Sequence, residues 1–276
     1  MVAALTEASA NLIDDPPNSQ ELLDRAREAA RGCQPLCRLA ELAQAALEEQ
    51  GFVQVRGFPL EHARRLFVAF SCLMGEPYID PAIGSALVPA HVRPGEVLMG
   101  NQLRRLPLHT DYSMMERPPR LTMSCCLRTD PVKDFGAVYV ADIESACFGV
   151  ENDPVIVRLK SVCLPFAALN ARNEVDVITR PILGKTADGR ITVRYHRSRI
   201  YKGFCICGQV PTEEQLQAML TFESLAQSVV QVLYPQAGDI TIIDNHRTVH
   251  GRERCSVEVH ADGTTTGRQM LFLFAY

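Results

Sequence analysis

Two histidine-bearing segments carry residue types that could bind a metal ion. The first is segment 106–111, Leu-Pro-Leu-His-Thr-Asp, in which an imidazole and a carboxylate stand two residues apart. In an extended chain residues i and i+2 point to the same side, so His109 and Asp111 can reach one ion. A second histidine from elsewhere would complete a two-histidine, one-carboxylate triad, which holds non-haem Fe(II) with open positions for a cosubstrate and O2.

The second segment, 238–252, contains two candidate histidines, His246 and His250, at i and i+4. On a helix that spacing would place both on one zinc ion, as in an H-E-x-x-H motif. The isoleucine-rich stretch 239–244 before them favours a strand instead. If the chain stays extended, the two histidines lie about 13 Å apart, so only one of them can join the triad.

These segments also carry a family resemblance. Segment 245–252, Asn-His-Arg-Thr-Val-His-Gly-Arg, together with the upstream His-Thr-Asp, resembles the taurine dioxygenase (TauD/TfdA) and clavaminate synthase-like family of Fe(II)/2-oxoglutarate oxygenases. Segments 51–58, 73–77, 126–131 and 141–142 are similar to the strands and helix end that the family carries in that order. The resemblance covers residues 40–276. It implies an α+β fold with a double-stranded β-helix (jelly-roll) core and flanking helices, iron bound by His109, Asp111 and His250, and 2-oxoglutarate as cosubstrate.

An arginine near the C-terminus is the candidate anchor for the cosubstrate. Arg268 heads a stripe of alternating residues with Met270, Phe272 and Phe274, which places it on the apolar face of a strand. A buried arginine needs an anionic partner, and its planar fork suits a carboxylate. The resemblance implies that Arg268 pairs with the distal carboxylate of 2-oxoglutarate. Arg252, two residues after His250, is the second candidate for cosubstrate binding.

The sequence departs from the family pattern at two positions. Val138 stands where the family has a threonine whose hydroxyl helps to hold 2-oxoglutarate, so another donor must replace it. Phe272 stands where the family often has a second arginine, which binds an anionic substrate in the taurine enzyme. The substrate therefore need not present an anion to that position.

The predicted reaction is hydroxylation of an unactivated C–H bond in a small molecule, an amino-acid derivative or natural-product intermediate, with release of succinate and CO2. Desaturation, cyclisation and epimerisation use the same ligands and stay open. A second hypothesis is a non-catalytic relative that has lost cosubstrate binding, which Val138 favours. A third is a zinc hydrolase that uses both His246 and His250.

Composition narrows the class of partner. The 276 residues include 28 Lys and Arg against 32 Asp and Glu, a formal charge of −4, which argues against a dedicated nucleic-acid binder. No apolar run is long enough to span a membrane, and the N-terminus lacks the features of a signal peptide. The ten cysteines lie inside apolar runs, so we expect reduced packing thiols and a cytoplasmic protein with a small-molecule substrate. The oligomeric state stays open.

We expect one domain over residues 1–276 to position these groups, with a helical part at 1–50. The Pro-rich segment 76–105 is predicted to be an irregular loop. This segment and region 166–205 are predicted to act as lids that determine substrate specificity. Asn18, three residues before Glu21, predicts a helix start, and Pro35 and Gly51 bound the next helix. Further helices are predicted at 60–74 and 212–233. Strands are predicted at 52–57, from 121, and at 136–141, 190–195, 239–244 and 268–275, with a hairpin turn at 260–267.

Overall fold

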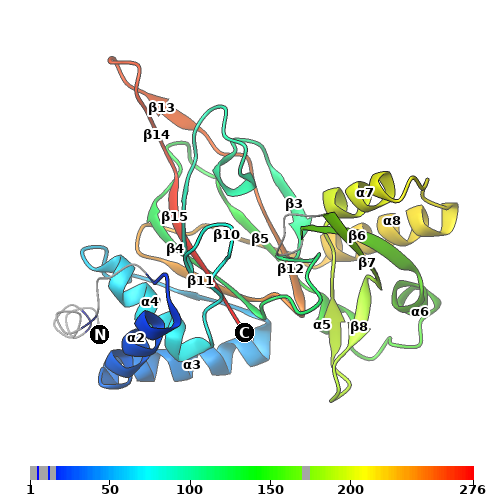
Figure 1. Ribbon diagram of the computed structural model, residues 1–276, viewed down its shortest axis with the longest axis horizontal. Helices are drawn as coiled ribbons and strands as arrows, with labels where there is room; N and C mark the ends of the chain where they lie inside the picture. Colours follow the sequence, from blue (N-terminus) through cyan, green and yellow to red (C-terminus); the bar gives the residue numbers. More distant parts are fainter. Residues whose placement is uncertain (1–4, 6–11, 13–16, 170–174) are drawn as a thin grey trace.

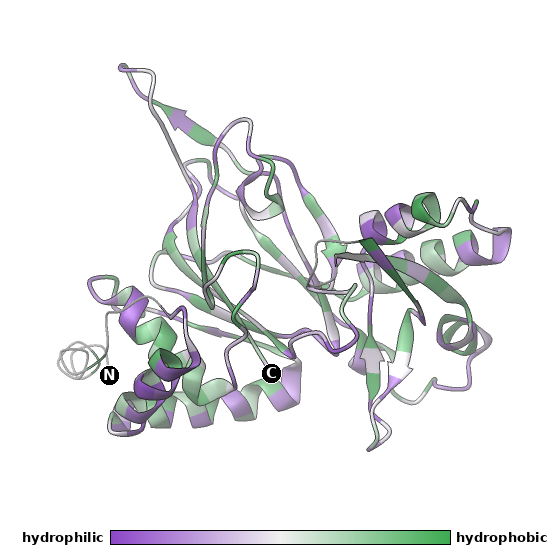
Figure 2. Cartoon of the chain, in the orientation of Figure 1, coloured by the Kyte–Doolittle hydropathy of each residue, from purple (hydrophilic) through white to green (hydrophobic). Residues whose placement is uncertain are grey.

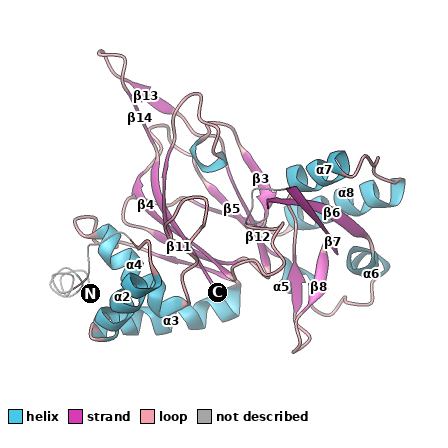
Figure 3. Cartoon of the chain, viewed as in Figure 1, coloured by secondary structure: helices cyan, strands magenta, loops and turns pink. Residues whose placement is uncertain are grey.

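The computed structural model describes residues 5, 12, 17–169 and 175–276 of the chain. Parts of two predicted regions, 1–50 and 166–205, therefore lie outside the described residues. Strands occupy the centre of the molecule and helices lie on both sides of them (Figure 3). The expected combination of α-helices with antiparallel sheets is confirmed.

Three helices near the N-terminus, α2 (Gln20–Arg31), α3 (Gln34–Gln50) and α4 (Ala63–Met74), pack beside one sheet. Hydrophobic and hydrophilic residues alternate along α2 and α3 (Figure 2), and the apolar sides join the sheet in one core. The predicted cap of α2 is wrong by one residue, because the hydroxyl of Ser19 accepts the N–H of Leu22. Asn18 and Ser19 are equally good capping types, so their order in the chain does not decide between them.

The first sheet has five antiparallel strands in the order β1 (Phe52–Val55), β11 (Ile240–Asp244), β4 (Leu121–Arg128), β15 (Gln269–Ala275) and β2 (Leu87–His91). Every residue of β11 is buried, which explains its run of isoleucines. The pairing of β15 with β4 shifts register between Gln269 and Met270. This irregularity lies directly after Arg268, and such bulges re-aim neighbouring side chains.

The second sheet has four antiparallel strands in the order β10 (Val230–Leu233), β5 (Val138–Asp142), β12 (Thr248–Arg252) and β3 (Leu106–His109). The predicted helix over 212–233 is wrong at its end. Helix α8 (Glu213–Ser228) stops five residues earlier than predicted, and β10 follows because Val230 to Leu233 pair with β5. Thr212 caps α8 as predicted, in a capping box with Gln215.

The segment 76–105 is not wholly irregular. It contains β2 and a short 3-10 helix, η2 (Met99–Asn101). Strand β2 exists because Leu87 to His91 pair with β15, almost two hundred residues further along the chain. Local sequence signals, among them Pro89 inside the strand, do not reveal such a long-range pairing.

A second helical group forms the other side of the molecule (right of Figure 1). Its helices are α5 (Ile143–Cys147), α6 (Pro154–Ser161), α7 (Arg197–Ile206) and α8. It also contains two two-stranded sheets: β6 (Cys163–Leu169) pairs with β7 (Val175–Pro181), and β8 (Leu183–Lys185) pairs with β9 (Ile191–Val193). Its own core includes Phe166, Tyr195 and Phe222. The hairpin of β13 (Val257–Val259) and β14 (Thr265–Gly267) projects from the opposite end. The turn predicted at 260–267 is shorter than predicted, because residues 265–267 form β14 and only 260–264 connect the two strands.

All ten cysteines are free thiols in the structure, and six of them are buried. The six buried thiols have the predicted role as packing residues. The prediction is wrong for Cys163, Cys205 and Cys207, which are exposed, and Cys37 is half-buried. Among the described helices, none has the length and apolar character needed to cross a bilayer.

Candidate metal centre

Strands β3 and β12 place His109 and His250 opposite each other. The two residues are register partners in the antiparallel pair, and their ring centroids lie 4.6 Å apart. Asp111 follows the end of β3; its Oδ2 lies 3.1 Å from Nε2 of His250 and its Oδ1 lies 3.7 Å from Nε2 of His109. Each residue offers a ligand atom, and these atoms all lie within 4.8 Å of one another. The three residues that the sequence nominates as ligands are thus brought together.

The imidazole of His109 is held as a neutral donor. Its Nδ1 lies 2.8 Å from the carbonyl oxygen of Pro107. Because a carbonyl can only accept, Nδ1 carries the hydrogen and the Nε2 lone pair faces Asp111 and His250. Burial, followed by the neighbouring His250, lowers the pKa of His109 to about 4. The ring is therefore uncharged at neutral pH and free to bind a cation.

Asp111 is held through both its carboxylate and its backbone. The Thr122 hydroxyl donates to its Oδ2 at 2.8 Å, while the side chain of Asn245 bonds to both its backbone N–H and its carbonyl. Burial alone would raise the pKa of Asp111, but His250, His109 and the Thr122 hydroxyl outweigh that effect and lower it. The carboxylate is consequently ionised over the whole physiological range.

This donor set fits a divalent iron ion. Two imidazoles and one carboxylate that converge from one side form the facial triad of non-haem Fe(II) oxygenases, which leaves the remaining positions open. The triad lines a cavity of about 300 Å³. The cavity is mostly apolar, with Val88, Leu98, Met99, Met114, Ile243, Phe272 and Phe274 among its lining residues.

Arg268 lines the same cavity and forms no ion pair with any acidic residue that the structure describes. Its side chain is only 4% exposed, and its Nη2 has no hydrogen-bond partner in the part of the chain that the structure describes. Burial lowers the pKa of the guanidinium, which lies near Cys255, Cys126 and Asp130. Asp130 is itself engaged by the backbone N–H and hydroxyl of Ser256. An unpaired buried guanidinium is costly, so this position fits an anionic ligand.

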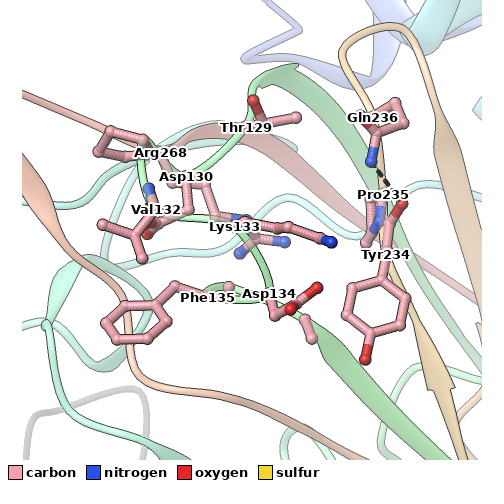
Figure 4. A pocket seen from close by; sticks show the side chains of 13 residues that line it. Thr129, Asp130, Val132, Lys133, Asp134, Phe135, Tyr234, Pro235, Gln236 and Arg268 are labelled. Carbon is pink, nitrogen blue, oxygen red and sulfur yellow. Dashed lines mark hydrogen bonds between the residues drawn. The ribbon is translucent and has the colours of Figure 1, made fainter.

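A tight turn makes room for Arg268. A Cβ on Gly136 would lie 2.9 Å from Cδ of Arg268, and Gly136 has φ of +68°. Loop 129–137 and the segment 234–236 line a second cavity, whose volume is about 550 Å³. Figure 4 shows the side chains that line it. Arg268 lines both cavities, so its side chain lies between the loop and the triad.

Ser124 offers a hydroxyl in the same cavity as Val138, the position at which the family has a threonine. Val138 begins β5 and lines the triad cavity without a polar atom in its side chain. Ser124 lines the cavity from β4, two residues after Thr122 and therefore on the same face of the strand. Its hydroxyl has no hydrogen-bond partner among the described residues and is thus available to a ligand.

The remaining candidates occupy different positions. Arg252 lines the triad cavity, and its guanidinium donates to the carbonyls of Gly100, Gln102 and Arg104, so it anchors the segment around η2. His246 lies in the turn between β11 and β12, where its Nε2 bonds to the Pro118 carbonyl at 3.0 Å. It does not belong to the three-residue donor group, as the strand-distance argument predicts.

Sequence reasoning does not single out four polar residues of this cavity: Thr122, Ser124, His196 and Arg199. The sequence predicts a strand from residue 121, but nothing in it indicates the bond of Thr122 to Asp111. His196 and Arg199 reach the cavity from the start of α7, far from either motif. Asn245, which bonds to the backbone of Asp111, is the first residue of the motif 245–252, so its place in that motif could have indicated a role at the site.

Comparison with known proteins places the chain among oxygenases. Residues 32–271 match the family described as "Taurine catabolism dioxygenase TauD, TfdA family". No curated protein matches the chain. Among solved structures, asparagine oxygenase in complex with Fe(II), 2S,3S-3-hydroxyasparagine and succinate superposes with a TM-score of 0.77 at 18% identity, covering 99% of this chain and 89% of the other. The non-heme iron oxygenase OrfP with Fe, succinate and (3R,4R)-dihydroxy-L-Arg gives a TM-score of 0.75 at 17% identity, covering 100% and 91%. At these identities the likeness establishes the fold.

Proposed function

The chain belongs to the taurine catabolism dioxygenase TauD, TfdA family, and we propose that it is an Fe(II)- and 2-oxoglutarate-dependent oxygenase. His109, Asp111 and His250 would hold the iron. The observation that carries this proposal is the convergence of their ligand atoms within 4.8 Å on the wall of one cavity. Bound iron with 2-oxoglutarate and O2 supplies oxidative decarboxylation to succinate and CO2, coupled to hydroxylation of a substrate C–H bond.

The protein's own groups prepare this site. The neutral ring of His109 and the ionised carboxylate of Asp111 offer lone pairs without first losing a proton. Thr122 fixes the carboxylate of Asp111 and Asn245 fixes its backbone, so metal binding does not have to order this residue. The mostly apolar lining of the cavity would surround a substrate C–H bond with few groups that bind water.

Arg268 would hold the distal carboxylate of 2-oxoglutarate. A dicarboxylate would satisfy its free Nη2 and offset its burial. Ser124 would supply the hydroxyl that Val138 lacks, because it lines the same cavity and has no hydrogen-bond partner among the residues that the structure describes. This assignment weighs against the hypothesis of a non-catalytic relative, which rests on Val138 alone.

We further propose that the five-stranded and four-stranded sheets form the two faces of a double-stranded β-helix within a single domain spanning residues 1–276. The pairing of β3 with β12 across the second sheet supports this arrangement, because it unites ligands from distant parts of the chain. Segment 76–105 acts as a lid: Ile83, Leu98 and Asn101 line the cavity from it. Region 166–205 contributes His196 and Arg199 and is assigned the same role.

The substrate is a small molecule, and an amino-acid derivative is the leading class. The two structural relatives named above were crystallised with hydroxylated amino acids. Asp111 occupies the third ligand position, which leaves no vacated position for a halide. Desaturation, cyclisation and epimerisation are alternative outcomes on the same ligands.

Anaerobic titration with Fe(II) and 2-oxoglutarate tests the proposal. A visible metal-to-ligand charge-transfer band should develop with one equivalent of each and be absent from His109→Ala. The matched control His246→Ala should keep the band, because His246 lies outside the donor group. A wild-type protein that shows neither the band nor succinate release would refute the proposal, and loss of the band in His246→Ala would favour a site that uses both histidines of segment 246–250.

A further inference from the structure

One cation of the triad cavity is unexplained by iron or cosubstrate binding. Arg199 lines the cavity from the first turn of α7. Its side chain is part-buried and has no ion pair or hydrogen bond with any described residue. Burial is the only influence on its pKa, which it lowers. A guanidinium that is partly removed from water and forms no ion pair is stabilised when it binds an anion.

The neighbouring arginine shows the contrast. Arg197, two residues earlier, is exposed and pairs with Glu223 through a 3.1 Å contact. Arg194, three residues before that, donates to backbone carbonyls of the segment after Asp111, including that of Ser113. Arg194 and Arg197 both have partners within the protein, whereas Arg199 lines the cavity without a partner among the described residues.

The surroundings of Arg199 also favour negative charge. His196, the residue before α7, lines the same cavity, is 9% exposed and has a buried Nε2 without a partner. The N-terminal turn of a helix carries a partial positive charge. The His196 ring lies 5.0 Å from that of His109, so this polar end of the cavity adjoins the metal centre.

The cavity offers no competing acid. Asp111 is the only carboxylate among the described residues that line it, and the proposed metal engages it. Phe272, at the position where the family often has a second arginine, contributes an apolar ring instead. With Arg268 engaged by 2-oxoglutarate, Arg199 is the one cation of the described lining that is left without a partner, and it faces a mostly apolar wall.

We infer that Arg199 binds the carboxylate of the substrate, assisted by His196, and that the substrate is an apolar acid with its anion at the α7 end of the cavity. This inference rests on the proposed function, because it takes the triad and Arg268 as engaged by iron and 2-oxoglutarate. The substrate anion would therefore be bound at the first turn of α7 and not on the C-terminal strand, where Phe272 stands.

Calorimetry with matched acid and amide probes tests the inference. The probes are N-acetyl-L-leucine and 4-methylpentanoate with their primary amides, titrated anaerobically into protein that holds Fe(II) and 2-oxoglutarate. The acids should bind the wild type more tightly than the amides. Arg199→Met should weaken acid binding about 10- to 100-fold, the range expected for a charge-assisted hydrogen bond, and leave amide binding unchanged. Arg199→Lys should recover part of the affinity, and Arg197→Met is the control that should match the wild type.

Two results would overturn the inference: no acid binding more tightly than its amide to the wild type, or equal acid affinity in Arg199→Met and the wild type. The charge-transfer band recorded on the same samples separates the two claims. It should persist in Arg199→Met, and its absence from the wild type would count against the proposed function. The acid–amide comparison needs neither turnover nor the band.

Discussion

The side chain of Asn245 grips the backbone of Asp111 from both sides. Its Oδ1 accepts the Asp111 N–H at 2.7 Å, and its Nδ2 donates to the Asp111 carbonyl at 3.1 Å. The same Nδ2 also donates to the carbonyl of Pro119. Asn245 thus ties the turn that precedes β12 to the segment that carries the carboxylate, and couples the two halves of the donor group.

Asn245→Ala should weaken Fe(II) binding about 10- to 100-fold, because outer partners that orient a ligand contribute on that scale. An anaerobic titration with Fe(II), which gives the dissociation constant of the metal, measures this effect. Asn152→Ala, which changes an exposed asparagine before α6, should bind iron like the wild type. Unchanged iron affinity in Asn245→Ala would show that the triad does not depend on this clamp.

Gly136→Ala should raise the dissociation constant for 2-oxoglutarate at least 10-fold. The added methyl would lie 2.9 Å from Cδ of Arg268 and displace the guanidinium. Gly149→Ala is the matched control: Gly149 also has positive φ, at +76°, but a Cβ there meets no atom within 4 Å. Both variants should lose about 1 kcal/mol of stability from backbone strain. Only Gly136→Ala should lose cosubstrate affinity, and equal affinities in the two variants would contradict the role given to Arg268.

Ser124→Ala should weaken 2-oxoglutarate binding about 5- to 10-fold, the effect of one lost hydrogen bond of roughly 1 kcal/mol or slightly more. The double variant Ser124→Ala with Val138→Thr should recover affinity, since it returns a hydroxyl to the family's position. Cosubstrate titrations of the charge-transfer band measure both effects. If Ser124→Ala binds like the wild type, another donor replaces the missing threonine.

Arg252→Met should release the segment around η2, because three backbone carbonyls lose their donor. Limited proteolysis between residues 96 and 104 should accelerate, and the KM for substrate should rise while iron affinity stays constant. Arg104→Met removes a more exposed arginine of the same segment and serves as control. Loss of 2-oxoglutarate affinity without faster proteolysis would instead assign Arg252 to cosubstrate binding.

The metal-free protein should lose stability as the pH falls from 7 to 5. Burial lowers the pKa of His109 to about 4 and that of His196 to about 3, below the ordinary value near 6.5. Between these values the unfolded chain takes up protons that the folded chain does not, so each histidine costs up to about 1.4 kcal/mol per pH unit. Urea unfolding at several pH values should show a reduced slope for His196→Gln and the wild-type slope for the exposed His260→Gln. A flat pH profile would contradict the neutral state assigned to His109.

How much the sequence predicts depends on how local the cause is. His109 and Asp111 share one strand end, and the strand character of 239–244 excludes a joint site for His246 and His250. Gly51 ends α3 with φ of +74°, as a helix-stopping glycine should. These conclusions need only neighbouring residues and their periodicity.

The features that the sequence does not reveal all depend on distant partners. Leu87 to His91 become a strand only because β15 lies beside them. The segment 230–233 leaves the predicted helix because β5 offers an edge to pair with. Arg199 stands in a sequence of three arginines between 194 and 199, and only the cavity distinguishes the unpaired one. Tertiary placement, rather than residue type, decides these three cases.

The most direct measurement of the central claim is a crystal structure of the protein grown anaerobically with Fe(II) and 2-oxoglutarate. The account predicts iron density between Nε2 of His109, the carboxylate of Asp111 and Nε2 of His250, with the distal carboxylate of 2-oxoglutarate on Arg268. Anomalous scattering at the iron edge identifies the ion. Iron bound at His246, or 2-oxoglutarate that does not contact Arg268, would contradict the account.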